Sequence, residues 1–179
     1  MEDYSVEELD LSNKGITELP DLTRYKNLKK LNCSNNQITH LDNLPLTLEI
    51  LDCAYNEITY LDNLPSNLKE LNCNNNQITH LENLPQTLIK LYCSRNKIIH
   101  LNNLPLTLEI LYCNNNQIRH LENLPQTLIE LNCSNNKITH LDNLLSTLKL
   151  LYCHNNPLKY NFEPTLENIR KYNLSLSLS

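Results

Sequence analysis

The residues best suited to chemistry are cysteines that recur at a fixed interval of twenty positions. The column consists of Cys33, Cys53, Cys73, Cys93, Cys113, Cys133 and Cys153. A structural zinc ion needs four ligands that converge tetrahedrally, which a straight row on parallel strands does not supply. Disulfide pairing would leave one thiol over, and the acidic start of the chain does not resemble a secretory signal. We therefore expect free, buried thiols that act as small apolar side chains in a reducing compartment.

Histidines recur at the same interval. They are His40, His80, His100, His120 and His140, and Tyr60 and Tyr160 complete their column. Because imidazole titrates near neutral pH, such a row could form a weak divalent-metal stripe or a pH-sensitive edge. The spacing implies no convergent set of ligands, so we expect a solvated outer row copied by repeat duplication, with no metal site.

No catalytic arrangement emerges from the remaining residues. The chain has a single glycine, Gly15, which excludes a glycine-rich phosphate loop, and it has no Gly-x-Ser-x-Gly motif. We expect no enzyme activity and no cofactor.

These columns need a repeated element to hold them in line. From Leu28 the chain follows the pattern L-x-x-L-x-C-x-x-N-x-I-x-x-L-x-x-L-P-x-x, which returns every twenty residues as far as Leu148. Alternation places Leu31 and Cys33 on one side of a short, half-buried strand. About ten residues and a proline such as Pro45 remain for the return path, which predicts an extended, polyproline-like back without a helix.

A second polar column falls where each strand ends, and its amides could bond backbone groups that the turn leaves unpaired. It consists of Asn36, Asn56, Asn76, Asn96, Asn116, Asn136 and Asn156. The first unit has Lys14 at this position.

The unbroken repeat predicts one domain over residues 1–179. Residues 1–27 form an N-terminal cap and a first, atypical repeat, 28–157 the consensus repeats, and 158–179 a C-terminal cap and tail. After Pro164, apolar residues at Leu166, Ile169 and Tyr172 predict a short amphipathic capping helix. The Leu/Ser tail from Asn173 could add a terminal strand or be disordered, and we expect it to be disordered.

From about Val6 to Pro157 this spacing resembles the leucine-rich repeat family. The twenty-residue period and the Leu-Pro pair resemble bacterial effector repeats, whereas the Cys and Asn content resembles repeat proteins of amoeba-infecting giant viruses. The resemblance implies a right-handed solenoid whose parallel β-sheet lines the concave face, with an extended convex side. It further implies that the concave face is the partner surface, and that the partner is a host protein if the chain is viral.

The outward strand positions vary while the framework does not. In the second half of the chain three tyrosines share one outward position beside two aliphatic residues, with an arginine and a histidine at the edge. These candidate protein-binding residues are Tyr92, Arg95, Ile110, Tyr112, Leu150, Tyr152 and His154. Exposed aromatic and arginine side chains carry much of the energy of protein interfaces. The alternative is that tyrosine is simply a good strand former.

Charge and hydropathy limit the partner class. The net charge is -5 and basic residues do not cluster along the sequence, so we expect no nucleic-acid partner. No apolar stretch approaches the length of about 18 residues that a membrane span needs. We expect a cytoplasmic monomer, located in the host cytoplasm if viral, that is a protein-protein interaction scaffold. The alternative is a structural protein that self-associates or belongs to a particle or matrix.

Overall fold

The computed structural model describes residues 4–142 and 144–177 of the chain. Residues 1–3 of the expected N-terminal cap, residue 143 of the repeats and residues 178–179 of the expected tail lie outside the described part. The elements are β1 (Glu8–Asp10), β2 (Lys30–Asn32), β3 (Ile50–Asp52), β4 (Glu70–Asn72), β5 (Lys90–Tyr92), β6 (Ile110–Tyr112), β7 (Glu130–Asn132), β8 (Leu150–Tyr152) and α1 (Leu166–Ser177).

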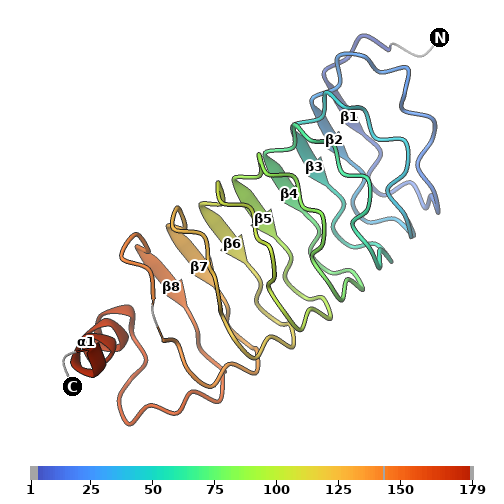
Figure 1. The fold of residues 1–179 in the computed structure, drawn as a ribbon. Helices are drawn as coiled ribbons and strands as arrows, with labels where there is room; N and C mark the ends of the chain where they lie inside the picture. Colours follow the sequence, from blue (N-terminus) through green and yellow to red (C-terminus); the bar gives the residue numbers. More distant parts are fainter. Residues whose placement is uncertain (1–3, 143, 178–179) are drawn as a thin grey trace.

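The strands form one eight-stranded parallel sheet in chain order, β1 to β8. Leu9 pairs with Leu31, twenty-two residues on, and Leu31 pairs with Leu51, twenty residues on. Figure 1 shows each strand followed by an extended return path, so that the chain winds as a coil with the sheet along one face. The predicted leucine-rich repeat solenoid is confirmed, and its atypical first unit is two residues longer than the next.

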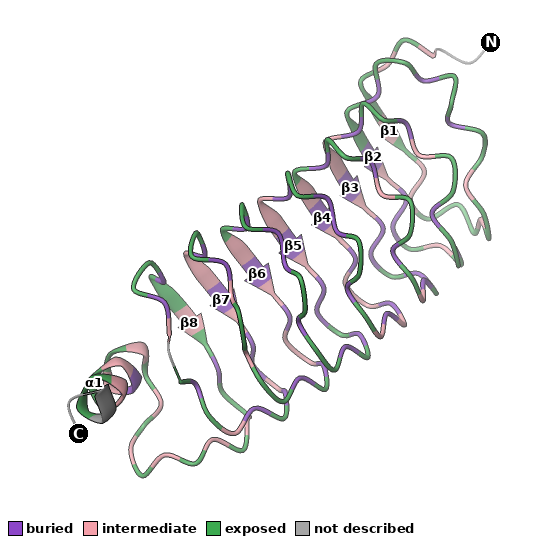
Figure 2. Ribbon diagram, in the orientation of Figure 1, coloured by how far each residue is buried: buried purple, intermediate pink, exposed green. Residues whose placement is uncertain are grey.

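The core lies between the sheet and the return paths. In the unit that begins at Leu48, the side chains of Leu51, Cys53 and Ile58 are each 0% exposed. Figure 2 shows this inward burial repeating along the array, with β1 and β8 more exposed than the strands between them. Period-two alternation in the strand therefore predicts the inward side chains correctly, and the return paths of the described repeats contain no helix.

The column asparagines hold neighbouring units together. Asn76 donates from Nδ2 to the carbonyl oxygens of Cys53 and Cys73, at 3.0 and 3.1 Å. Its Oδ1 accepts from the backbone N–H of Ile58 at 2.9 Å. One side chain thus bonds the backbone of two units, which confirms the structural role expected for this column. Lys14 occupies the equivalent position in the first unit, where the amide of Asn36 accepts from its backbone N–H.

The residue before each column asparagine adopts a left-handed backbone conformation. Asn35, Asn75 and Asn115 have φ between 55° and 57°, and Tyr55 and Arg95 share the conformation at 55° and 56°. Asparagine tolerates this region better than other residues with a side chain. A second left-handed column, absent from the sequence predictions, precedes the Leu-Pro pair at Asn43, Asn63, Asn83, Asn103 and Asn123.

Helix α1 covers the C-terminal end of the coil (Figure 1). Thr165 caps it by accepting from the backbone N–H of Asn168 at 3.2 Å, and Ile169 is 0% exposed against the core. The capping helix is confirmed, but the prediction of disorder from Asn173 is wrong, since α1 continues to Ser177. Once Leu166 and Ile169 nucleate the helix, each further residue adds a backbone hydrogen bond at little cost. Asn173 also anchors this turn by donating to the carbonyl of Leu141 at 3.0 Å.

Within the described residues, no helix is both long enough and apolar enough to cross a membrane.

Candidate protein-binding surface

The outward face of β5 and β6 carries an aromatic pair. Tyr92 and Tyr112 are register partners, and their rings meet edge to face with centroids 5.3 Å apart at 89°. This is a favourable geometry for aromatic rings, and it holds both side chains in place on the sheet. The pair forms a rigid aromatic surface that needs little ordering when a partner binds.

The hydroxyl of Tyr112 is tied to the next strand, where it donates a hydrogen bond to Oε1 of Glu130. This bond, together with partial burial, raises the pKa of Tyr112 to about 12. Burial and the nearby Glu70 carboxylate also raise the pKa of Tyr92. Both rings are therefore neutral hydrogen-bonding groups over the physiological range.

Leu150 and Tyr152 on β8 present the most exposed apolar side chains of the sheet, at 48% and 44%. Their strand is the last of the sheet, so one flank has no further strand beside it. Glu130 and Asn132 of β7 lie between them and the β6 side chains Ile110 and Tyr112. The predicted residues therefore share one face but form two apolar groups, separated by a polar strand.

Arg95 and His154 lie beyond the carboxyl ends of β5 and β8. Arg95 is exposed and left-handed, and its backbone N–H donates to the Asn114 carbonyl at 2.9 Å. His154 Nδ1 lies 3.0 Å from the Ser134 hydroxyl, which orients its ring along the face. We call Tyr92, Arg95, Ile110, Tyr112, Leu150, Tyr152 and His154 the tyrosine patch.

Glu130 is a member of this surface that the sequence predictions missed. It precedes Asn132, the register partner of Tyr112, by two residues, so its side chain projects from the same face. The sequence signal for Glu130 is its position: it lies two residues before Asn132, the residue twenty positions after Tyr112, and so on the same face of the next strand.

The cysteine column offers no reactive thiol. All seven are free and buried. Burial raises the pKa of Cys73 and Cys113 to about 12, so both remain protonated thiols at neutral pH. These observations agree with the expected role of the column as small apolar side chains.

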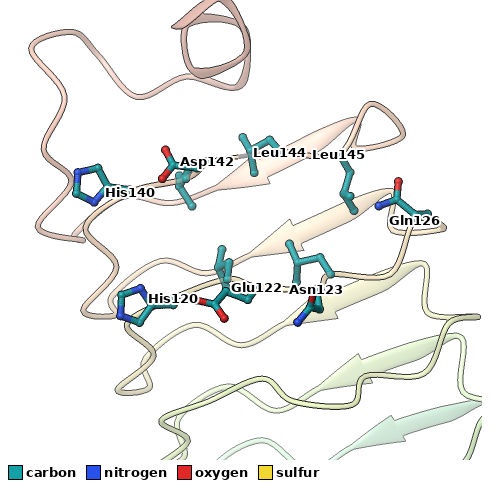
Figure 3. A pocket seen from close by; sticks show the side chains of 11 residues that line it. His120, Glu122, Asn123, Gln126, His140, Asp142, Leu144 and Leu145 are labelled. Carbon is teal, nitrogen blue, oxygen red and sulfur yellow. The ribbon is translucent and has the colours of Figure 1, made fainter. Parts of the chain in front are cut away.

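The histidine column lies along the return paths and borders shallow pockets. One of about 670 Å³ lies between the sixth and seventh units and is lined by His120, Glu122, His140 and Asp142 together with several leucines. Figure 3 shows both imidazole rings at one end of this pocket and Gln126 at the other. No group of three His, Cys, Asp or Glu side chains in the described residues is placed to hold a metal ion. The metal-stripe alternative therefore has no geometric support there.

Two protein-family models match parts of the chain. A model of Leucine Rich repeats (2 copies) matches residues 5–46, and a model of a single Leucine Rich Repeat matches residues 67–90. The chain is a leucine-rich repeat protein. No curated protein matches this leucine-rich repeat chain.

Solved leucine-rich repeat structures superpose on most of the chain. A Shigella effector LRR domain is 28% identical with a TM-score of 0.76, over 96% of this chain and 76% of that domain. The functional domain of InlJ from Listeria monocytogenes, described as including a cysteine ladder, is 31% identical with a TM-score of 0.68, over 86% and 40%. The complex of TLR13 with ssRNA13 gives 26% and 0.68, over 80% and 25%. The chain thus spans well under half of InlJ and a quarter of TLR13.

Proposed function

We propose that this leucine-rich repeat protein is a non-catalytic scaffold that binds a protein partner over β5 to β8. One observation carries the proposal: a rigid tyrosine pair lies on the same open face as Leu150 and Tyr152, which are 48% and 44% exposed. Aromatic anchors with few conformations lose little entropy on binding and dominate interface energies. The leucine-rich repeat fold, which commonly mediates protein-protein interaction, supports the proposal.

The absence of catalysis belongs to the same proposal. The thiols are buried and protonated, and the histidines are spread along the coil with no more than one in any unit. The one thiol with a side-chain hydrogen bond among the described cysteines, Cys153, donates to the Pro164 carbonyl and not to a base. The Ser134 hydroxyl does lie 3.0 Å from His154 Nδ1, but Ser134 is only 1% exposed, so a substrate has little access to it.

The free thiols fit a protein that resides in a reducing compartment. Seven free thiols at neighbouring positions favour the cytoplasm, which is the host cytoplasm if the resemblance to giant-virus repeat proteins reflects the source. We infer that the partner is a cytoplasmic protein, and an amoebal lysate is the first material to search.

Self-association is the second candidate, and the N-terminal end of the coil favours it. Leu9, Leu11 and Ile16 of the first unit are only half-buried. Their equivalents in the second unit, Leu31, Cys33 and Ile38, are at most 1% exposed. Because α1 covers the other end, such contacts would join two copies at their first units and then stop. Light scattering over a concentration series separates a monomer, as proposed here, from this dimer.

Affinity capture with paired variants tests the scaffold. Tyr112→Ala/Tyr152→Ala removes two patch rings, and Tyr55→Ala/Tyr60→Ala removes two tyrosines that are 55% and 62% exposed outside the patch. Circular dichroism first establishes that both variants fold. We expect a protein retained by the natural chain and by the control pair to be lost by the patch pair. Equal retention by both variants would refute the location of the site.

A further inference from the structure

Basic side chains line one edge of the last four units. They follow the strands on the return path, and each is exposed: Lys97, Arg119, Lys137 and Lys159, one in each consecutive unit. Equivalent positions in the second to fourth units hold Gln37, Glu57 and Gln77 and three threonines. We call these four cations the basic edge. It accompanies β5 to β8, the same strands that carry the tyrosine patch.

The backbone fixes the spacing of the basic edge. The N–H groups of Lys97 and Lys137 donate to the preceding unit's isoleucine carbonyl at 2.9 and 2.8 Å, and Lys159 donates to Thr139 at 3.0 Å. Lys97 and Lys137 each precede a buried isoleucine of the core and themselves remain exposed. Since units stack at about 4.8 Å, the four cations span roughly 15 Å along the coil.

These cations have no acidic partner among the described residues. The Lys97 ammonium group donates only to Oε1 of Gln77 at 3.2 Å, and none of the four takes part in an ion pair there. Two carboxylates of the neighbouring sheet face bond residues of the sheet itself: Glu130 accepts from Tyr112, and Glu70 pairs with Lys90 at 3.1 Å. Glu109 is exposed beside β6. Glu122 and Asp142, farther along the same return paths, line the pocket of Figure 3. The basic edge is therefore a local concentration of positive charge, although the chain carries a net charge of -5.

We propose that the partner of the tyrosine patch is recognised through an acidic polypeptide segment that lies along the basic edge. The inference rests on the proposed function and adds the chemistry of the partner. Complementary charge at the border of an apolar patch sets the orientation and specificity of a complex. A chain that is negative overall repels acidic molecules at long range, so binding requires this local match.

A polypeptide fits better than a nucleic acid. Glu70 and Glu130 lie among the tyrosines on the sheet face, and Glu109 is exposed beside β6. These carboxylates disfavour a nucleic acid, which carries a phosphate on every nucleotide. A polypeptide can place its acidic side chains on the basic edge and turn backbone N–H groups toward the carboxylates.

Fluorescence anisotropy with labelled polymers tests the inference on the intact protein. The probes are a random copolymer of glutamate and tyrosine, a copolymer of lysine and tyrosine, and a single-stranded oligouridylate. We expect the acidic copolymer to bind most tightly and to weaken as salt increases. Lys97→Gln/Arg119→Gln should weaken its binding by about fivefold. The control Lys14→Gln/Lys26→Gln, which makes the same charge change at exposed positions in the first unit, should leave its binding unchanged.

Three outcomes overturn the inference: no binding of the acidic copolymer, equal losses in the two variants, or tighter binding of the oligouridylate. The proposed function is tested separately. Capture that depends on Tyr112 and Tyr152 but not on Lys97 and Arg119 would retain the scaffold and reject the acidic segment. If both the Tyr112→Ala/Tyr152→Ala and the Lys97→Gln/Arg119→Gln variants still capture the partner, the proposed scaffold site is rejected.

Discussion

The asparagine at the end of each strand bonds two units at once. Its contribution to the free energy of unfolding therefore depends on its place in the array. Asn76 is 8% exposed and holds two cysteine carbonyls and the Ile58 N–H. Asn156 makes the same set of bonds but is more exposed, because only the cap follows it. Water can replace lost bonds at Asn156 but not at Asn76.

We therefore expect Asn76→Ala to lower the free energy of unfolding by about 3 kcal/mol or more, since it leaves several buried groups unpaired. Asn156→Ala should lower it by about 1 kcal/mol. Urea denaturation followed by circular dichroism measures both. Equal losses at the two positions would contradict the bridging role.

Two residues occupy a backbone conformation that suits asparagine better. Tyr55 and Arg95 have φ of 55° and 56°, at positions where the neighbouring units have Asn35, Asn75 and Asn115. A left-handed conformation costs an ordinary side chain roughly 1 kcal/mol or more, and asparagine less. At Arg95 this strain lies within the tyrosine patch, as is frequent for functional residues.

Tyr55→Asn and Arg95→Asn should each raise the free energy of unfolding by about 0.5 to 1 kcal/mol. Thermal unfolding of the two variants and of Asn115→Ala, which should be destabilised, measures this. Only Arg95→Asn should also weaken capture of the partner. If neither exchange stabilises the protein, the left-handed turn carries no strain at these positions.

At the scale of the elements, threonine hydroxyls link successive return paths by hydrogen bonds to backbone carbonyls, and Arg170 of α1 makes the last of these links. Thr127 Oγ1 donates to the carbonyl of Leu106 in the preceding unit and to that of Leu108 at the start of its own unit, at 2.8 and 2.7 Å. The equivalent carbonyls forty residues on, those of Ser146 and Leu148, instead accept from Arg170 on α1, at 3.1 and 2.7 Å. The capping helix therefore imitates a further repeat.

Arg170→Ala should loosen the C-terminal end selectively, because it leaves backbone carbonyls without a donor. We expect a loss of roughly 2 kcal/mol in local stability and faster amide exchange in β8 and α1, with β3 to β5 unchanged. Arg170→Lys should recover part of the protection, since an ammonium group reaches fewer carbonyls at once. Hydrogen-deuterium exchange read by mass spectrometry gives the comparison, and uniform loss across all strands would argue against a local cap.

The elements were largely predictable because each depends on a local pattern. Leu31 and Cys33 alternate in a strand, the return path has no room for a helix, and Pro164 precedes a helical spacing. The helical tail was missed because the alternating Leu and Ser from Asn173 resemble a strand, and nothing local reveals the anchor on Leu141. The strand residues of the patch share one sheet face, as period-two alternation predicts, but the division of the patch by Glu130 and Asn132 depends on which variable side chains become neighbours. The basic edge was missed because its cations lie about twenty residues apart in sequence, at positions outside the strands.

At the scale of the whole molecule, stacking makes stability a sum over neighbouring units, and the thiols make that sum depend on pH. Burial raises the pKa of Cys33, Cys73 and Cys113 to about 12, and it also raises the pKa of the other four thiols. An unfolded thiol has a pKa of about 8.5. Below that value both states are protonated, and the full stability is present. Between it and the folded pKa only the unfolded state releases protons, so stability falls as pH rises.

Each buried thiol should therefore lower the free energy of unfolding by about 1.4 kcal/mol per pH unit once the pH exceeds about 9. Urea unfolding at several pH values between 8 and 10, in a reducing agent, should show a steep loss of stability spread over the whole array. Cys73→Ala/Cys113→Ala should reduce the slope, although each exchange also lowers stability at pH 8 by opening a small cavity. Lys14→Gln serves as the control, since Lys14 is exposed and lies outside the thiol column. A slope that is the same in the double variant and the natural chain would mean that the thiols are not buried as a continuous column.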